Sequence, residues 1–573
     1  MKITLTKKQF FKLHGWLGMN FGLLLTLICL SGVVATLSHE IEWLANPSLR
    51  IEAEDSVRWQ DTYEASQKAY PEFNIGGFSK GERNVMDGLA WDLSSTAPGG
   101  NFGKVRVDPY KAEVVQDATL LFLTDFFRQL HYNFFHSWGY YLVCFISFPL
   151  LLSIISGLLF YKKWWKSLFK LRIGRGRHAF YSSLHRFIGV WTMIFGLIIG
   201  ITGVWYFMEI TVMPGETVYP SAPKIPEEKM ASHGTSPQLL SLDTYVEKAT
   251  EAFPELKPNG IYLPYSPGGP VTVRGQTGGV LVRDRANAVY LDPFDAEVIG
   301  IKRSKEDGAV SWWINSVDAL HFGYWGGLTT KILWAIFGLC LPALVLSGAY
   351  LSLRRSGVVG NKKSCRSAEK IPLWRRYPVR TWFTLPLLFI LIWWGIQGYE
   401  KRNITVEAPP QVLITNTTIG PWNVAVSREE TIYTGSNTLF FTKFQAGENR
   451  MANFKNAKFR LSDASGDAVA QSDLQSQSQP HAMWANLDLP EEIDKISHLQ
   501  INVTAWDEQS LSKKIPVDFT NAPKIILAKG ETKAEHKKTA QPPTGNLFFG
   551  LVFGYIVLSS CIAIGWVVLD RKQ

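Results

Sequence analysis

The stretches LHGWLG at 13–18 and LHRFIG at 184–189 decide the fold of this chain, because each carries a histidine into a long apolar run. The spacing of 171 residues between them recurs further along, where Ser31-Gly32 in the first run corresponds to Thr202-Gly203 in the second. Repetition of short motifs at a fixed distance indicates a duplicated structural unit. The two histidines therefore occupy equivalent positions in two copies of one membrane segment.

A second pair of stretches, LHYNFF at 130–135 and LHFGYW at 320–325, leads into two further apolar runs. These runs also end in a hydroxyl residue followed by glycine, at Ser156-Gly157 and Ser347-Gly348. The pattern predicts a duplicated four-helix bundle with one histidine at the start of each helix. Imidazoles placed in this way inside a helical bundle are typical haem ligands. The four histidines are His14, His131, His185 and His321.

The composition indicates an α-helical membrane protein with large water-exposed parts. A length of 573 residues exceeds one domain, and a mean hydropathy of +0.01 averages very apolar with very polar stretches. The first apolar run lacks a small-residue cleavage site and recurs at 185–208, so we interpret it as a retained helix and not as a signal peptide. Runs of the roughly 20 residues that cross a bilayer lie near 14–37, 138–160, 187–208, 331–353, 381–398 and 547–569.

Basic residues give the predicted orientation, because short loops rich in Lys and Arg stay on the cytoplasmic side. The loop 161–184 holds basic residues from Lys162 to Arg177 and no acidic residue, and the loop 354–380 holds a similar excess against Glu369 alone. Both loops and both termini are therefore predicted to be cytoplasmic. This topology accounts for most of the net charge of +10. The basic patches could also meet anionic membrane lipid, and no nucleic-acid partner is expected.

Three long stretches lie outside on this topology, and the first two repeat each other. DTYEASQKAYPE at 61–72 resembles DTYVEKATEAFPE at 243–255, and VDPYKAEVV at 107–115 resembles LDPFDAEVI at 291–299. In each stretch a helical pattern precedes strands, and Asp-Pro supplies the turn between two β-rich runs. Each stretch is predicted to be a small α+β domain.

The third outside stretch has a different pattern. Short alternating runs such as VLITNTTI and LQINVTAW are separated by Gly, Asn, Asp and Pro, which predicts a β-sandwich tethered by the fifth and sixth helices.

The predicted division of the whole chain is a first helix at 1–39, an outside domain at 40–130, a second helix at 131–160, a basic loop at 161–184, a third helix at 185–208, a second outside domain at 209–318, a fourth helix at 319–353, a basic loop at 354–380, a fifth helix at 381–398, the β-rich domain at 399–545, and a sixth helix with its tail at 546–573.

Cysteine usage limits the cofactors that the chain can carry. There is no CxxCH motif, so a covalently attached c-type haem is excluded, and no CxxC cluster suggests iron–sulfur or structural zinc. Any haem is therefore b-type. The sequence also has no GxGxxG fingerprint between a strand and a helix, and no P-loop. No nucleotide site is predicted.

These motifs resemble those of the PepSY-associated transmembrane proteins, a family of iron-regulated inner-membrane proteins of Gram-negative bacteria that includes ferric-siderophore reductases. The resemblance covers about residues 8–356 and rests on His14-Gly15-Trp16-Leu17-Gly18, the later histidine motifs, the Ser/Thr-Gly pairs and the two Asp-Pro turns. It implies a di-haem membrane reductase with two periplasmic PepSY-like domains. Some relatives carry a cytoplasmic flavin reductase module that is absent here, so the electron donor is open.

The depth of the histidines in the membrane predicts how they pair. His14 and His185 begin spans at the cytoplasmic face, whereas His131 and His321 begin spans at the outer face. Two b-type haems are therefore expected, one between each pair at equal depth. On the outer side, His39 and His136 are alternative ligands, although neither has a counterpart in the duplication. The simpler interpretation is that histidines at an interface are amphipathic side chains at headgroup level.

The expected function is transfer of electrons across the inner membrane, from a quinol or a cytoplasmic reductase to a periplasmic ferric siderophore, with release of Fe(II). The alternative is a non-redox protein whose PepSY-like domains bind a peptide or ligand as a sensor. A transporter is less well supported, because the spans lack intramembrane carboxylates. The acceptor is expected to dock between the two domains, above the outer histidines. Its candidate contacts are Arg83, Tyr132, Arg274 and Tyr324.

Overall fold

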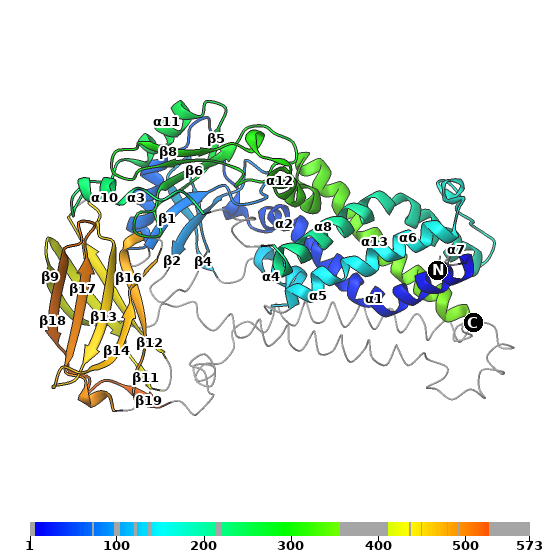
Figure 1. The fold of residues 1–573 in the computed structure, drawn as a ribbon. Helices are drawn as coiled ribbons and strands as arrows, with labels where there is room; N and C mark the ends of the chain where they lie inside the picture. Colours follow the sequence, from blue (N-terminus) through cyan, green and yellow to red (C-terminus); the bar gives the residue numbers. More distant parts are fainter. Residues whose placement is uncertain are drawn as a thin grey trace.

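The computed structural model describes residues 6–355 and 411–526, apart from short internal gaps. Long helices form one end of the molecule, a large sheet lies beyond them, and a separate β-rich domain forms the other end (Figure 1). The expected basic loop 354–380 from residue 356 onward, the fifth span at 381–398 and the sixth at 546–573 lie outside the described residues. The internal gaps are 72–73, 97–103, 120–122, 136–138, 214–220, 435–436, 448–449, 478 and 491.

Among the described residues, four stretches of helix are long and apolar enough to cross a membrane. They turn large apolar side chains such as Leu152, Ile194 and Ile336 outward, as a lipid-facing surface requires. Among these helices, α1 packs against α6 and α13, and α6 packs against α8. The spans are α1 (Lys7–Thr36), α5 (Gly139–Phe145) with α6 (Ser147–Phe160), α8 (Met193–Thr211) and α13 (Gly327–Arg355).

Two of the four histidines do not begin a membrane helix, in contrast to the expectation. His131 lies at the end of α4 (Leu123–Tyr132), and His321 lies at the end of α12 (Ala309–Phe322). Gly323 ends α12 in the left-handed conformation, with φ of +72°, before α13 begins. These two histidines therefore enter the bundle from separate short helices. His14 lies in α1 and His185 in α7 (Arg177–Trp191), which leads into α8.

The two repeats that are predicted to lie outside the membrane, here called the outside repeats, share one eight-stranded sheet in the order β4-β3-β2-β1-β5-β6-β7-β8. They meet where β1 and β5 pair antiparallel, with Phe78 opposite Ile261. At Gly77 the backbone has φ of +118°, and a Cβ atom there would lie 2.0 Å from the Ile261 carbonyl oxygen, so this junction requires glycine. The strands are β1 (Asn74–Ser79), β2 (Trp91–Thr96), β3 (Lys104–Asp108), β4 (Glu113–Thr119), β5 (Lys257–Tyr262), β6 (Val271–Gln276), β7 (Asn287–Leu291) and β8 (Val298–Lys302).

Each repeat has a helix followed by four strands, and the predicted Asp-Pro turns are confirmed. The Asp108 carboxylate accepts a hydrogen bond from the backbone N–H of Tyr110, and Asp292 accepts one from the backbone N–H of Phe294. The helices of the outside repeats and their connections are α2 (Ser38–Ala45), α3 (Trp59–Ala69), α10 (Glu227–Ser232) and α11 (Leu242–Ala252). Short 3-10 helices lie at Pro47–Leu49, Trp164–Ser167, Ser304–Glu306 and Ile493–Lys495.

The β-rich domain at 411–526 packs two sheets around an apolar core that includes Trp422, Phe440 and Phe459. It contacts the second outside repeat, where the Trp422 indole N–H donates to the Thr235 carbonyl. Its two larger sheets have the orders β15-β16-β12-β10-β9 and β14-β13-β17-β18, and β11 pairs with β19. The strands are β9 (Gln411–Ile419), β10 (Trp422–Glu429), β11 (Ile432–Thr434), β12 (Asn437–Gln445), β13 (Asn456–Ser462), β14 (Ala468–Asp473), β15 (Gln475–Gln477), β16 (Gln479–Asp488), β17 (His498–Thr504), β18 (Ser510–Pro516) and β19 (Lys524–Ile526).

Candidate functional site

The four histidines form two pairs in the structure. The ring centres of His14 and His185 are 6.1 Å apart, and those of His131 and His321 are 6.2 Å apart. An imidazole nitrogen lies about 2.0 Å from a bound metal and about 1.1 Å from its own ring centre, so two rings on opposite sides of one metal ion have centres about 6.2 Å apart. Both separations therefore leave room for one metal ion between two imidazoles.

Each histidine ring is held through Nδ1 by a partner on another helix. His14, His131 and His185 donate Nδ1–H to the carbonyl oxygens of Ser153, Ile28 and Leu344, at 2.9, 2.9 and 3.0 Å. Since a carbonyl oxygen can only accept, Nδ1 carries the proton, and the lone pair remains on Nε2. This arrangement is typical of histidines that bind a metal through Nε2.

His321 uses a threonine hydroxyl in place of a carbonyl. Its Nδ1 lies 2.8 Å from Thr202 Oγ1, and that hydroxyl donates its own proton to the Ile198 carbonyl at 2.8 Å. The threonine oxygen therefore accepts from His321, and the result is again an unprotonated Nε2. Burial lowers the pKa of both His131 and His321, and the pKa of His321 falls to about 3. Both outer imidazoles are thus neutral at physiological pH, as metal ligation requires.

The Ser/Thr-Gly pairs lie at these contacts. Three of their four glycines lie against histidine rings. A Cβ atom added at Gly32 would lie 2.7 Å from His131 Cε1, and one at Gly348 would lie 2.9 Å from His185 Cε1. The corresponding distance from Gly157 to His14 Cε1 is 3.5 Å. The fourth, Gly203, instead faces the Ser147 side chain.

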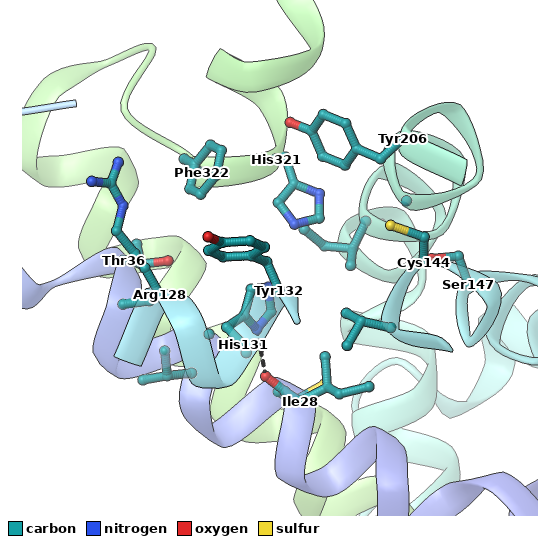
Figure 2. Close-up of a pocket in the computed structure, with 18 of the residues that line it drawn as sticks. Ile28, Thr36, Arg128, His131, Tyr132, Cys144, Ser147, Tyr206, His321 and Phe322 are labelled. Atoms are coloured by element: carbon teal, nitrogen blue, oxygen red, sulfur yellow. Dashed lines mark hydrogen bonds between the residues drawn. The ribbon is translucent and has the colours of Figure 1, made fainter. Parts of the chain in front are cut away.

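The outer pair lines a cavity of about 600 Å³ between the membrane helices and the outside repeats (Figure 2). Its size lies within the range of about 300–1,000 Å³ that is usual for cofactor and ligand sites. Helix α4 contributes Arg128, His131 and Tyr132 to this cavity, and α12 contributes Asp318, His321 and Phe322. The deep part is apolar. The polar lining includes Glu82, Arg83, Asp125, Arg128, Arg285 and Asp318.

A polar network fixes the outer end of this cavity. The Tyr206 hydroxyl donates to the Asp318 carboxylate at 2.8 Å, and the Arg83 guanidinium lies 4.0 Å from the same carboxylate. Arg83 also lies over the Phe322 ring, at 3.8 Å from its centre. The Arg83 backbone N–H donates to the Asp284 carboxylate at 2.7 Å, which links the loop after β1 to the second repeat. His321 is therefore flanked by a cation that several contacts hold in place.

The alternative outer ligands are placed differently. His39 is buried on α2 and lines a second, small cavity together with Tyr324 and Lys331. His136 lies outside the described residues. Of the acceptor contacts expected from the sequence, Arg83 and Tyr132 line the large cavity and Tyr324 lines the small one. Arg274 instead stacks over Tyr262, at 4.5 Å from its ring centre, within the sheet.

A further cluster of possible metal ligands lies in the second outside repeat. His233, Asp292 and Asp295 bring their ligand atoms within 4.8 Å of one another. The Lys229 ammonium, however, lies 3.2 Å from Asp292 and 3.1 Å from Asp295, so the cluster already holds a cation. The two histidine pairs are therefore the better candidates for a metal.

Several residues at the outer site were not predicted from the sequence. Thr202 was recognised only as part of a Ser/Thr-Gly pair, and Arg128 and Asp318 were not singled out at all. The only sequence signal for Arg128 and Asp318 is position, since each lies three residues before a histidine of the outer pair and so about one helical turn away.

A family model described as PepSY-associated TM region matches residues 11–355, which is more than half of the chain and includes all four paired histidines. No curated protein matches the chain.

Proposed function

The chain belongs to the family of the PepSY-associated TM region, and on this premise we propose that it is a di-haem oxidoreductase of the bacterial inner membrane. It carries electrons outward from a quinol or a cytoplasmic reductase and reduces a ferric siderophore in the periplasm. Both termini are cytoplasmic in this proposal, and the shared sheet and the β-rich domain are periplasmic. The four candidate membrane helices support the membrane location.

The observation that carries this proposal is the geometry of the two histidine pairs. Ring centres 6.1 and 6.2 Å apart fit two imidazoles on opposite sides of one metal, and every Nδ1 has an acceptor. Haem bound between two histidines supplies reversible one-electron storage with no open iron position, which favours electron transfer over oxygen chemistry. The chain has no CxxCH motif, so both haems would be b-type.

The two pairs lie at different depths along one helix. His14 is near the start of α1, and Ile28, whose carbonyl accepts from His131, is on the same helix. The intervening residues rise roughly 21 Å along the axis, which is most of a hydrocarbon core about 30 Å thick. Two redox centres at these depths would divide the crossing into shorter steps, which supports transmembrane electron transfer.

The position of the outer cavity supports an acceptor on the outside. Glu82, Arg83 and Arg285 come from the outside repeats and lie at the polar part of the cavity lining. An acceptor that reaches them approaches the outer histidine pair. In a ferric siderophore, one electron converts chelated Fe(III) to Fe(II), which hard oxygen ligands hold less tightly. Iron would thus be released with the chelator intact.

The alternative function is non-redox binding of a peptide or ligand by the outside domains. The observation that favours it is the continuous eight-stranded sheet, which offers a broad platform joined to the β-rich domain. The two functions differ in one simple respect, since only the first requires haem.

The first prediction concerns stoichiometry. Full-length protein purified from haem-sufficient cells should contain two haems per chain, because two histidine pairs have the ligand geometry. Acid-acetone should extract both, and dithionite-minus-oxidised spectra should show low-spin b-type bands. A ratio near zero would favour the binding function, and a ratio near one would mean that a single pair binds haem.

A second prediction concerns Thr202. Thr202→Val keeps the shape of the side chain but removes the acceptor of the His321 Nδ1–H. Loss of such a supporting hydrogen bond typically weakens metal binding by about 10–100-fold. The rate of outer-haem transfer to a haem-free globin should therefore increase by about that factor. Thr211→Val is the matched control, because Thr211 also lies on α8 and bonds to a carbonyl one turn back, but it is exposed. Equal rates for the two variants would contradict the role of Thr202.

A further inference from the structure

The outer cavity is polar at one end and apolar at the other. Its deep part is lined by Ile28, Ile146, Leu150, Phe195 and Leu341, which belong to or adjoin the membrane helices. Its outer part is lined by charged side chains, including three arginines, Arg83, Arg128 and Arg285. Haem b also has an apolar part and a polar part, because it is a flat apolar ring with two carboxylates on one edge. The cavity therefore favours one orientation of such a ring, with the carboxylates toward the outside.

Arg128 is positioned to meet one of these carboxylates. It lies on α4 three residues before His131, so the two side chains share one side of the helix. Arg128 lines the large cavity (Figure 2) and also lines the small cavity. Within the described part of the chain, its guanidinium forms no ion pair. A cation that lines a cavity in this way is a suitable partner for an anionic group.

Arg83 is the second such cation. It too lines both cavities, and its stacking on Phe322 holds the guanidinium beside the residue that follows His321. The nearest carboxylates are only loosely engaged, since Asp318 lies 4.0 Å away and Glu82 lies 3.9 Å away. Glu82 is also shared with Arg285, at 3.8 Å. Arg83 can thus accept a further anionic partner without breaking a short ion pair.

We propose that Arg128 and Arg83 bind the two carboxylates of the outer haem and direct that edge toward the outside repeats. This inference rests on the proposed function, because it assigns residues to a haem between His131 and His321. It makes the carboxylate edge the part of the cofactor nearest to an arriving acceptor. The arginines act as positioning residues, and each comes from a different element, α4 and the loop after β1.

The test compares two proteins with two cofactors. Both proteins are full-length and carry His185→Ala, so that only the outer pair remains. One of them also carries Arg128→Met. Each is loaded with haem b or with haem dimethyl ester, in which both carboxylates are blocked. The measurement is the rate of cofactor loss to a haem-free globin. Charge-assisted hydrogen bonds of this kind are worth about tenfold or more in affinity. Arg128→Met should release haem b about tenfold faster, and both proteins should release the ester at the same rate.

Three controls make the outcome decisive. Arg128→Lys keeps the charge and should retain most of the slow release, and Arg83→Met should behave as Arg128→Met does. Arg274→Met removes an arginine that stacks within the sheet and should leave the release rate unchanged. If Arg128→Met accelerates release of the ester as much as that of haem b, the arginine has a structural role and the inference fails. If neither cofactor binds even without the arginine change, the proposed function fails instead.

Discussion

Replacing either His131 or His321 with alanine should remove the same haem and lower the content from two haems per chain to one. The reason is that the two rings lie 6.2 Å apart and would hold one haem together in the proposed function, so that either substitution would remove one of its two protein ligands. His14→Ala and His185→Ala should likewise remove one common component, which is the other haem. The measurement is the low-temperature reduced spectrum of each purified variant, together with its haem-to-protein ratio.

His39→Ala is the control for this experiment. His39 was the alternative outer ligand, but it lines the small cavity and not the large one, so its variant should retain both haems. The paired assignment is contradicted if His131→Ala and His321→Ala abolish different spectral components. If the spectral component of the outer haem is lost in His39→Ala but not in the other variants, His39 is a haem ligand.

The second large effect should appear in electron delivery to an iron chelate. Protein reduced in detergent and mixed anaerobically with a ferric hydroxamate or catecholate should reoxidise rapidly, while an Fe(II) trap develops colour. In His131→Ala, the haem expected to remain is the one proposed between His14 and His185, near the start of α1, and no haem would be left at the outer pair. Its reoxidation by the chelate should therefore fall to the rate seen in buffer.

His14→Ala is the matched comparison, because it removes a haem but leaves the outer pair in place. Its outer haem should still reoxidise rapidly with the ferric chelate. If no ferric chelate reoxidises the unmodified protein faster than buffer does, but a protein partner or a copper compound does, the siderophore is not the acceptor. The transmembrane electron-transfer function would survive that result.

The pairing of the histidines could be predicted because it follows from duplication. Equivalent positions in two repeats lie at equal depth, and the spacing from His14 to His185 equals that from Ser31 to Thr202. The local turns at Asp108 and Asp292 were also predictable, since the Asp side chain bonds to the backbone two residues later. Both conclusions use only short-range pattern and symmetry.

Other features depend on which helices become neighbours, and the sequence does not encode these in a local pattern. Gly32 contacts His131 because α4 packs on α1, and Gly348 contacts His185 because α7 packs on α13. The junction of β1 with β5 depends on the register between two strands almost two hundred residues apart. The positions of His131 and His321 on separate helices depend on Gly323 and on the positive φ angles of Phe134 and Phe135, which the apolar patterns did not reveal.

The composition of each histidine pair has an evolutionary consequence. Every pair takes one ring from the first repeat and one from the second, and β1 and β5 continue one sheet across the same boundary. A single repeat therefore supplies one histidine of each pair and completes neither pair. A chain with one repeat could have formed these histidine pairs only as a symmetric homodimer, with each pair on the twofold axis. Fusion of two copies makes the pairing independent of protein concentration and leaves the two halves free to differ, as they do three residues before the histidine, where the first repeat has Arg128 and the second has Asp318.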